Sequence, residues 1–329
     1  MAAALGPDAL LDVQMGGGRV LLTGPVAPDG DSIGAALGLQ RVLQRHGVDC
    51  DVAGCISFRY KWMPGAHRML PDTEVRPGYR AVVVLDGDRN RLTAQAQVAF
   101  QAAAIKGIID HHASTRPDGY THAWLSPDTA STCEMVYELL SARREPIDAD
   151  LAALLYAGSV FDTGGFRHSN TTPETLRMAA ALMATGIDHT AICARVLMER
   201  RVPGLRLTAE IYGSAQFYAD GSIVVGKVTQ GARKRLSLVD GDSEGVVDAL
   251  VYTQGVEVAV LIIERDDGTV KYSLRSRGNV DLVAVARELS PTGGGHRKAA
   301  GASTRCSVEV AESLVVRTLS AHLAIAAAS

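Results

Sequence analysis

Four clusters of acidic and histidine residues follow short apolar runs in the first half of the chain. They are Asp29 and Asp31 in PDGDS, Asp86 at the end of VVVLD, Asp110-His111-His112 at the end of GIID, and Asp162 in SVFDTGG. Carboxylate oxygens with an imidazole are ligands that suit Mn²⁺ or Mg²⁺, and none of these clusters offers a thiolate. The residue types therefore indicate a divalent cation, with manganese preferred and magnesium as the alternative.

Each cluster taken alone also has a purely structural interpretation. Asp29 or Asp31 suits a helix N-cap, Asp86 a turn, and the two histidines a polar strand end. Together, unpaired carboxylates gathered at one sheet edge would repel one another unless cations were bound. The four carboxylates of Asp29, Asp31, Asp86 and Asp162 sum to −4, which two divalent ions neutralise. Two ions about 3.5–4 Å apart could clamp a phosphoryl oxygen and activate water for in-line attack, which is phosphoester hydrolysis.

The segments that precede these clusters have the pattern of buried parallel strands. The strand-like runs are 19–22, 81–85 and 105–109, and amphipathic stretches typical of helices lie near 32–46, 91–104, 131–143 and 148–160. This alternation predicts a doubly wound α/β domain with a parallel sheet. Such a sheet places its ligand site at the carboxyl ends of its strands, where the clusters stand.

The second half of the chain has a different pattern. From about 173 to 218 the apolar spacing indicates consecutive helices, and after them SIVVGKV, VEVAVLIIERD and VKYSLRSR indicate strands, with helices near 241–252, 281–288 and 308–327. The length of 329 residues fits about two domains. We therefore expect a metal-binding catalytic domain over 1–185, a helical connector over 186–215, and a smaller α+β domain with a mixed sheet over 216–329.

Composition narrows the classes of partner. Lys and Arg number 33 against 36 Asp and Glu, a net charge of −3, so no global basic field exists to hold long duplex nucleic acid. Five scattered cysteines without a C-x-x-C pair are typical of reduced thiols. The N-terminus lacks a basic segment before its short apolar stretch, and no apolar run is long enough to span a membrane. These features predict a cytoplasmic protein without a membrane partner.

The motifs in their order resemble the DHH phosphoesterases, a family named for the triplet that stands here as Asp110-His111-His112. The similarity includes VAPDGDSIGAALGL, VVVLD, IIDHHAS, STCEMVYELL and YAGSVFDTGGFRHSNTTPETL, and PTGGGHRKAAGAS resembles the GGGH loop of the DHH-associated C-terminal domain. It covers about residues 18–320. Within the family, the length and short connector are similar to the nanoRNase/pAp phosphatase group, which acts on very short RNA, linear or cyclic dinucleotides and 3′-phosphoadenosine 5′-phosphate.

The resemblance implies roles for particular residues. Its metal ligands would be Asp29, Asp31, Asp86, His111 and Asp162, with Asp86 and Asp162 as bridging carboxylates. Asp110 would orient an imidazole. His112 would face the scissile phosphate as a hydrogen-bond donor or leaving-group acid, with a merely orienting role as the alternative.

The glycine-rich motif of the second half is the candidate substrate-binding element. Gly293, Gly294 and Gly295 can expose backbone N–H groups to a phosphate, although a tight structural turn is the alternative interpretation. Followed by His296, and with Arg275 and Arg277 on a preceding strand, the motif predicts a clamp for an anion and a base.

One position departs from the family pattern. The first family motif usually begins with a metal-ligating His four residues before Asp29, and Pro25 stands there. The first of two expected metal sites would therefore be weakened, unless His168 substitutes as a ligand.

The implied function is hydrolysis of short oligoribonucleotides or dinucleotides, of 3′-phosphoadenosine 5′-phosphate, or of both. A homodimer is the oligomer considered, and the sequence leaves the oligomeric state open. The alternative is a nucleotide-binding or regulatory protein whose catalysis has decayed. Inorganic pyrophosphatases lack the GGGH motif and RecJ-like exonucleases need additional domains, so both are disfavoured.

Overall fold

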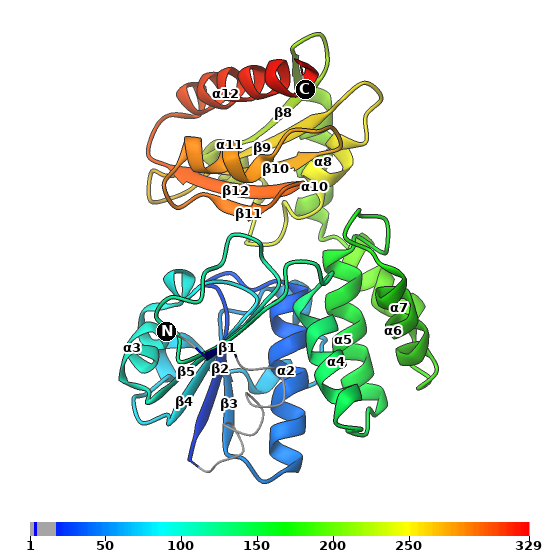
Figure 1. Ribbon diagram of the computed structural model, residues 1–329. Coiled ribbons are helices and arrows are strands. Elements are labelled where there is room, and N and C mark those ends of the chain that lie inside the picture. The colour runs from blue at the N-terminus through cyan, green and yellow to red at the C-terminus, as the bar shows by residue number, and fades with distance from the viewer. Residues whose placement is uncertain (1–2, 5–17, 329) are drawn as a thin grey trace. The chain divides into compact units, whose positions relative to one another are not determined.

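The computed structural model describes residues 3–4 and 18–328, and the chain divides into two compact units, Met1–Glu199 and Arg200–Ser329 (Figure 1). Each unit has its own sheet and its own hydrophobic core. The finer domain boundaries at 185 and 215 stay predictions.

The N-terminal unit contains a parallel sheet in the order β1-β6-β5-β4-β2-β3. Its strands are β1 (Ala3–Ala4), β2 (Val20–Thr23), β3 (Cys50–Ala53), β4 (Ala81–Leu85), β5 (Ile105–Asp110) and β6 (His122–Leu125). β2 and β4 are buried along their whole length, which explains their continuous apolar runs. The doubly wound α/β prediction is confirmed.

Helices cover both faces of this sheet (Figure 1). They are α2 (Gly30–Arg45), α3 (Ala94–Ala102), α4 (Thr132–Ala142), α5 (Ala149–Asp162), α6 (Pro173–Met183) and α7 (His189–Cys193), with a π-helical turn at Ala194–Met198 and 3₁₀ turns at Phe58–Tyr60, Ala66–Arg68, Asp72–Glu74 and Arg89–Arg91. The larger core joins α2, α4 and α5 to one face, and α3 packs with a smaller core on the other. The helices of the larger core, α2, α4 and α5, therefore have ends that lie next to the acidic clusters.

Two glycines allow α2, α4 and α5 to approach closely. A Cβ at Gly34 would lie 2.6 Å from the carbonyl oxygen of Leu154 and 2.9 Å from Sγ of Cys133. A Cβ at Gly158 would clash with the same sulfur and lie 3.0 Å from Cα of Asp31. Because neither contact leaves room for a side chain, these glycines fix how near Asp31 lies to the start of α4.

The C-terminal unit contains a mixed sheet in the order β11-β12-β10-β9-β8-β7, in which only β8 and β9 pair in parallel among the described strands. Its strands are β7 (Gln216–Tyr218), β8 (Ile223–Val228), β9 (Val258–Glu264), β10 (Val270–Ser276), β11 (Gly294–His296) and β12 (Ala299–Thr304). Its helices are α8 (Val202–Ser214), α9 (Gln230–Leu236), α10 (Val246–Val251), α11 (Leu282–Leu289) and α12 (Val308–Ala328). α11 and α12 pack on one face of the sheet, and α8 and α10 pack on the other. This mixed α+β unit agrees with the predicted fold class.

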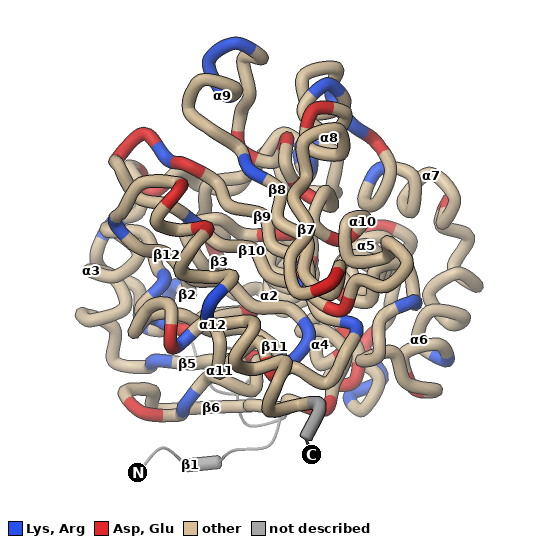
Figure 2. Tube along the Cα trace, turned by 90° about the horizontal axis from the view of Figure 1, so that it is seen from above, with Lys and Arg blue, Asp and Glu red and all other residues tan. Residues whose placement is uncertain are grey.

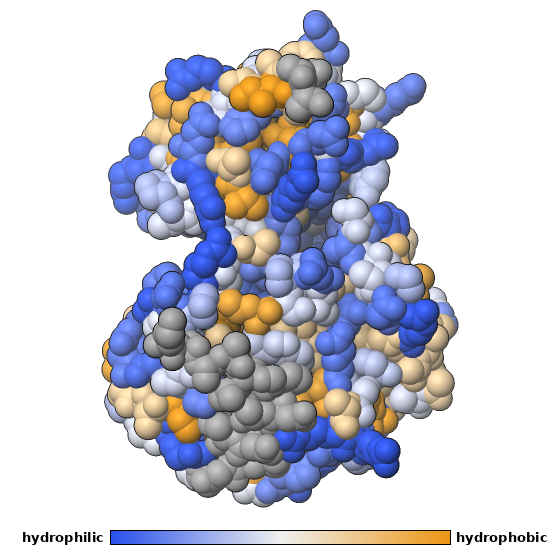
Figure 3. Space-filling view, viewed as in Figure 1, coloured by the Kyte–Doolittle hydropathy of each residue, from blue (hydrophilic) through white to orange (hydrophobic). Residues whose placement is uncertain are grey.

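The surface of the described residues is mixed in character. On the face that Figure 3 draws, hydrophobic residues form separate orange areas among hydrophilic ones. The basic run of α9 is blue in Figure 2, and ion pairs occupy part of it, since Arg235 contacts Glu210 at 2.7 Å. Within residues 3–4 and 18–328, none of the helices combines the length and apolar character that a membrane span requires.

An ion-paired N-cap at the start of α5 gives a test of stability. Asp148 accepts a hydrogen bond from the Leu151 N–H at 2.9 Å and contacts the Arg41 guanidinium at 3.0–3.1 Å. Partial burial would raise the pKa of Asp148, but the hydrogen bonds from Leu151 and Arg41 and the nearby positive charges lower it overall. The charged carboxylate is therefore the form that stabilises the fold.

We expect Asp148→Ala to lower the free energy of unfolding at pH 7 by about 1–2 kcal/mol, and Asp148→Asn, which keeps a capping oxygen, by less than about 1 kcal/mol. Because the folded-state pKa lies below the unfolded-state value of about 3.9, the deficit of the Asn variant should be complete above about pH 5 and shrink as the pH falls through the folded pKa. Urea titrations at several pH values measure both effects. Equal losses in the two variants at pH 7 would contradict the capping role.

Candidate metal centre

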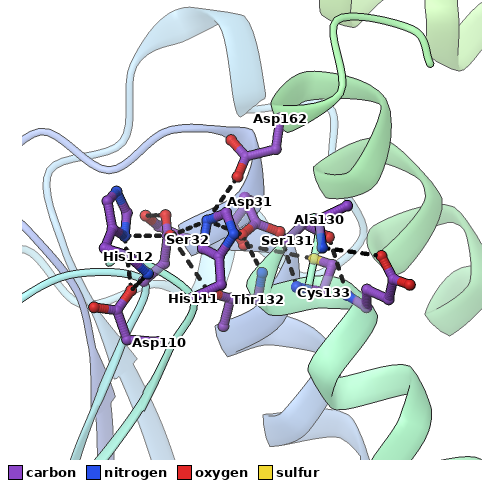
Figure 4. Close-up of polar contacts among 12 residues, drawn as sticks. Asp31, Ser32, Asp110, His111, His112, Ala130, Ser131, Thr132, Cys133 and Asp162 are labelled. Carbon is purple, nitrogen blue, oxygen red and sulfur yellow. Dashed lines mark hydrogen bonds and ion pairs between the residues drawn. The ribbon is translucent and has the colours of Figure 1, made fainter. Parts of the chain in front are cut away.

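The acidic clusters converge at one edge of the parallel sheet. β2, β4 and β5 are neighbours, so their carboxyl ends lie side by side. Asp86 follows β4, His111 follows β5, and Asp31 lies in the first turn of α2, just after β2. Asp162 is the last residue of α5, and its side chain points toward His111 (Figure 4). The fold therefore assembles residues from four separate segments, as the sequence predicts.

Four of these residues form a compact group of potential ligands. One side-chain atom each from Asp31, Asp86, His111 and Asp162 lies within 4.8 Å of all the others. Nε2 of His111 is 2.8 Å from Oδ2 of Asp162, 3.5 Å from Oδ1 of Asp86 and 4.0 Å from Oδ2 of Asp31. Asp31, Asp86 and His111 are buried. Bulk water therefore contributes little to screening the charges of this group.

The start of α4 holds the Asp31 carboxylate. The backbone N–H of Thr132 donates to Oδ2 at 2.6 Å, and that of Cys133 donates to Oδ1 at 2.9 Å. Ser131 caps this helix by accepting from the Glu134 N–H at 3.0 Å. The positive end of the α4 dipole faces the acid and stabilises its charge.

Asp86 occupies a strained backbone position. Its φ of 61° lies in the left-handed region, which costs a non-glycine residue about 1–3 kcal/mol. Ser32 Oγ donates to Asp86 Oδ2 at 2.6 Å, and Thr132 Oγ1 donates to Oδ1 at 3.3 Å. These contacts maintain the turn that directs the carboxylate toward His111.

His111 is fixed by the backbone of the loop before α4. Its Nδ1 lies 3.1 Å from the Thr129 carbonyl oxygen, so this nitrogen carries the proton and Nε2 faces the carboxylates. The buried Glu134 carboxylate anchors the loop by accepting from the Ala130 N–H at 3.3 Å, while Asn170 donates to the Ala130 carbonyl oxygen at 2.9 Å. The loop therefore sets the tautomer of the imidazole.

Asp110 orients His112. Its Oδ1 lies 2.7 Å from Nδ1 of His112, and Thr115 Oγ1 donates to its other oxygen. Asp110 is fully buried, whereas 18% of the His112 side chain is exposed. Asp110 therefore fixes the position of Nδ1 and the orientation of the His112 ring (Figure 4).

Asp29 and Pro25 occupy the position of the expected first metal site. Asp29 caps α2, because its Oδ1 accepts from the N–H groups of Asp31 at 3.0 Å and Ser32 at 3.1 Å. Among the described residues, it lies outside the four-residue group. Pro25 is buried beside Gly87, where an added Cβ would lie 3.6 Å from its ring. Nδ1 of His168 lies 3.1 Å from the backbone oxygen of Asp162, so it contacts the main chain and not the carboxylate.

The electrostatics of the group favour a cation. Burial, followed by the charges of Asp86 and Asp162, raises the pKa of Asp31 to about 8. The same causes raise the pKa of Asp29 well above its usual value. Burial alone would lower the pKa of His111, but Asp162 and Asp86 raise it well above its usual value. Three crowded carboxylates and an imidazole of fixed tautomer are a donor set that fits a divalent cation.

The predicted clamp residues lie together in the C-terminal unit. His296 pairs with Ala299, and Ala299 pairs with Arg275, so the His296 and Arg275 side chains project from the same face of the sheet. Gly294 and Gly295 are part of β11 in the β11–β12 hairpin, with φ of 135° at Gly295, and Gly293 directly precedes this strand. At Gly293 a Cβ would overlap the carbonyl oxygen of Ala286. Glycine is therefore required at both positions for structural reasons.

Comparison with known proteins identifies the family. Residues 19–159 match the family model described as the DHH family, N-terminal domain, and residues 220–316 match the DHHA1 domain. The chain is 31% identical over 290 residues to the bifunctional oligoribonuclease and PAP phosphatase NrnA of Thermus thermophilus, across 88% of this chain and 85% of that protein. The chain belongs to the DHH family.

Two further similarities extend over most of this DHH-family chain. The cyclic-di-AMP phosphodiesterase GdpP of Geobacillus thermodenitrificans is 27% identical over 301 residues, which are 84% of this chain and 43% of that protein. The crystal structure of an exopolyphosphatase-related protein from Bacteroides fragilis matches with a TM-score of 0.83 at 25% identity, covering 95% of this chain and 96% of that one. The family predicted from the motifs is confirmed.

Several residues that support the DHH-domain site were not predicted. They are Ser32, Thr115, Thr129, Thr132 and Cys133. The sequence Ser131-Thr-Cys-Glu134 has the pattern of a capping box, which could have indicated a helix start with exposed N–H groups. The target of those N–H groups could not be inferred, because Asp31 is about a hundred positions away in the sequence.

Metal binding should stabilise this chain through the four-residue group. At a Mn²⁺ concentration a hundredfold above Kd, binding adds about 2.7 kcal/mol, a rise in Tm of about 5–10 °C. Asp86→Asn and His111→Gln should each abolish the rise, because each removes a ligand, whereas Asp118→Asn at an exposed acid should retain it. Thermal unfolding with Mn²⁺, with Mg²⁺ and with a chelator measures the effect. A full metal-dependent rise in either ligand variant would refute the assignment.

Proposed function

We propose that this chain is a metal-dependent phosphohydrolase for short oligoribonucleotides or dinucleotides, for 3′-phosphoadenosine 5′-phosphate, or for both. The NrnA relative is named as an oligoribonuclease and PAP phosphatase, and the GdpP relative as a cyclic-di-AMP phosphodiesterase. The observation that carries the proposal is the group of Asp31, Asp86 and His111, which are buried, and Asp162, which is partly buried, at one sheet edge. Its chemistry is suited to phosphate esters, because bound cations would attract the anionic substrate that the acids alone would repel.

In the proposed mechanism, the four-residue group would hold a divalent cation, and Asp29 would help to hold a second one. Metal ions at such a site polarise a phosphoryl oxygen and activate the attacking water. Asp31 is held by the α4 N–H groups and His111 by the Thr129 carbonyl oxygen, so both keep their orientation without a substrate. This preorganisation would limit the rearrangement required during the reaction.

His112 would provide the proton that the leaving oxygen needs. Asp110 contacts its Nδ1 at 2.7 Å, and Nε2 would donate to the phosphate or to the departing oxygen. Thr115 donates to the second oxygen of Asp110, so the acid is itself oriented. Asp110 would therefore act as a positioning residue and His112 as the catalytic acid.

The DHHA1 domain would bind the remainder of the substrate. The chain as a whole has a net charge of −3, so an anionic substrate needs a local positive site. This charge would come from Arg275, Arg277 and His296. Backbone N–H donors would come from Gly293, Gly294 and Gly295. The shared row of His296 and Arg275 on one sheet face supports this assignment. Nε of Arg275 also contacts Asp248 at 2.6 Å, which orients its guanidinium.

A substrate panel tests the proposed function. The purified chain is assayed with Mn²⁺ and separately with Mg²⁺ against 3′-phosphoadenosine 5′-phosphate, linear and cyclic dinucleotides, a five-nucleotide RNA, a long RNA and pyrophosphate. We expect turnover of one or more of the first four substrates, faster with Mn²⁺, and little turnover of long RNA or pyrophosphate. Exclusive hydrolysis of pyrophosphate would refute the proposal.

A nucleotide-binding or regulatory protein with decayed catalysis is the second candidate. Pro25 favours it, because proline offers no ligand atom, and so does the capping role of Asp29. Retention of the four-residue group and of the Asp110–His112 pair argues for catalysis. Nucleotide binding without turnover across the whole panel would favour this candidate.

His112→Gln should separate acid catalysis from metal binding. We expect kcat to fall by about 10²–10⁴-fold while KM and the metal-dependent rise in Tm stay close to those of the unaltered chain. His67→Gln, at an exposed histidine in the same unit, is the matched control and should leave kcat unchanged. Steady-state kinetics at saturating Mn²⁺ measure the effect. If His112→Gln kept more than about a tenth of the kcat of the unaltered chain, the acid role would be contradicted.

Pro25→His tests whether the first metal site is weakened. In the unaltered chain we expect calorimetry to show one tight Mn²⁺ site and a second, much weaker one, with the rate rising beyond the concentration that fills the tight site. The added imidazole should tighten the weak site and increase turnover at low Mn²⁺. Pro25→Leu controls for loss of the fixed proline φ without adding a ligand. Two equally tight sites in the unaltered chain, with no gain in the His variant, would overturn this prediction.

A further inference from the structure

Helix α10 and strand β10, together with the residue that follows the end of each, form two contacts in the DHHA1 domain. Asp248 and Tyr252 are four residues apart, the spacing that places two side chains on one face of a helix. Arg275 lies on β10 and projects toward α10, and Arg277 follows two residues later, just after the strand ends, and not on it as predicted. Asp248 contacts Arg275 at 2.6 Å, and the Arg277 guanidinium lies 5.3 Å from the centre of the Tyr252 ring.

Tyr252 is not needed to attach α10 to the sheet. The helix is anchored by four buried residues, Val246, Val247, Leu250 and Val251. The Tyr252 side chain follows the last of them and is 48% exposed, and Arg277 is also exposed. The Tyr252 ring is therefore available to a ligand, because about half of its surface is in solvent while one side lies beside the Arg277 guanidinium.

The two arginines differ in their charge partners. Arg275 is paired with Asp248, whereas within residues 3–4 and 18–328 no carboxylate lies within ion-pair distance of Arg277. The Arg277 backbone N–H continues the sheet ladder by donating to the Glu257 carbonyl oxygen at 2.8 Å, which fixes the position of the residue. Its positive charge therefore remains available to an anion.

The sheet face next to Arg275 carries short side chains. Across from Arg275 in the ladder lies Ala299, and two positions further along β12 lies Gly301. Both are partly exposed although their side chains are minimal, and His296 follows in the same row as Ala299. The sheet face beside Arg275 therefore carries little side-chain bulk on its β12 side.

We infer that Tyr252 is a stacking surface for a nucleobase, and that Arg277 binds a phosphate of the same nucleotide. An aromatic face with an adjacent unpaired guanidinium matches the two halves of a nucleotide, a planar base and an anion. Stacking is tolerant of base identity, because every base has a π-face, so the surface selects nucleotides as a class. The inference rests on the proposed function for its substrate and deepens it by naming a residue that recognises the base.

The test compares ligands with and without a base on the full-length chain. Affinities for adenosine 5′-monophosphate and for ribose 5-phosphate are measured by calorimetry in a chelator, so that no turnover is required. Tyr252→Leu, which keeps apolar bulk, and Tyr252→Ala should weaken the nucleotide by about 5- to 150-fold, equivalent to about 1–3 kcal/mol, and leave ribose 5-phosphate unchanged. Tyr252→Phe should stay within about twofold of the unaltered chain. Tyr212→Ala on α8, at a tyrosine that is 49% exposed, is the matched control.

The outcomes separate this inference from the proposed function. For a dinucleotide substrate, Tyr252→Ala should raise KM by a similar factor with kcat unchanged. Loss of nucleotide affinity in a chain that hydrolyses no substrate would support the stacking surface and refute the proposed hydrolase. Unchanged nucleotide affinity in Tyr252→Ala, or an equal loss for both ligands, would overturn the stacking role whatever the activity.

Discussion

Repulsion among buried carboxylates is the constraint on which the N-terminal unit depends. Asp31, Asp86 and Asp162 each place an oxygen near Nε2 of His111, and burial removes most of the water that would screen them. Without a cation, the charge is relieved only by protonation, which the raised pKa values of Asp31 and His111 express. Such an arrangement lowers the stability of the fold when no cation is bound. A cation bound to the native state would offset this loss.

The scaffold offsets part of this repulsion with backbone dipoles. The first turn of α4 donates two N–H groups to Asp31, and close packing at Gly34 and Gly158 brings that helix within reach. The left-handed backbone conformation of Asp86 is a second unfavourable contribution to folding, and the hydrogen bond from Ser32 and the surrounding sheet hold the residue in it. Both costs occur where the parallel strands end, which agrees with the rule that α/β sheets bind ligands at this edge.

Much of this arrangement could be predicted from the sequence because it depends on local patterns. Continuous apolar runs identified β2, β4 and β5, and the acidic residues at their ends indicated the site. β3 and β6 escaped prediction because CDVA carries a charge and HAWL is only partly buried, and the glycines and alanines of β11 and β12 lack the β-branched side chains typical of strands. Which imidazole Asp110 orients, and which backbone atoms hold Asp31, depend on contacts that only the folded chain creates.

The candidate site has two ends, one around His111 and one around Asp29 and Pro25. They differ in how many of their potential ligands are held in place by the fold. Around His111, three of the four potential ligands are held by a second contact: His111 by Thr129, Asp86 by Ser32 and Asp31 by the α4 backbone. At the other end, Asp29 uses one oxygen to cap α2, and Pro25 contributes no donor atom. A carboxylate that caps a helix keeps its second oxygen for a ligand, so capping and metal binding are compatible, but an ion at this end would lack the imidazole ligand that the family pattern places at Pro25. Occupancy of this end would then depend on the phosphate itself, whose oxygens can complete the coordination of a weakly held ion.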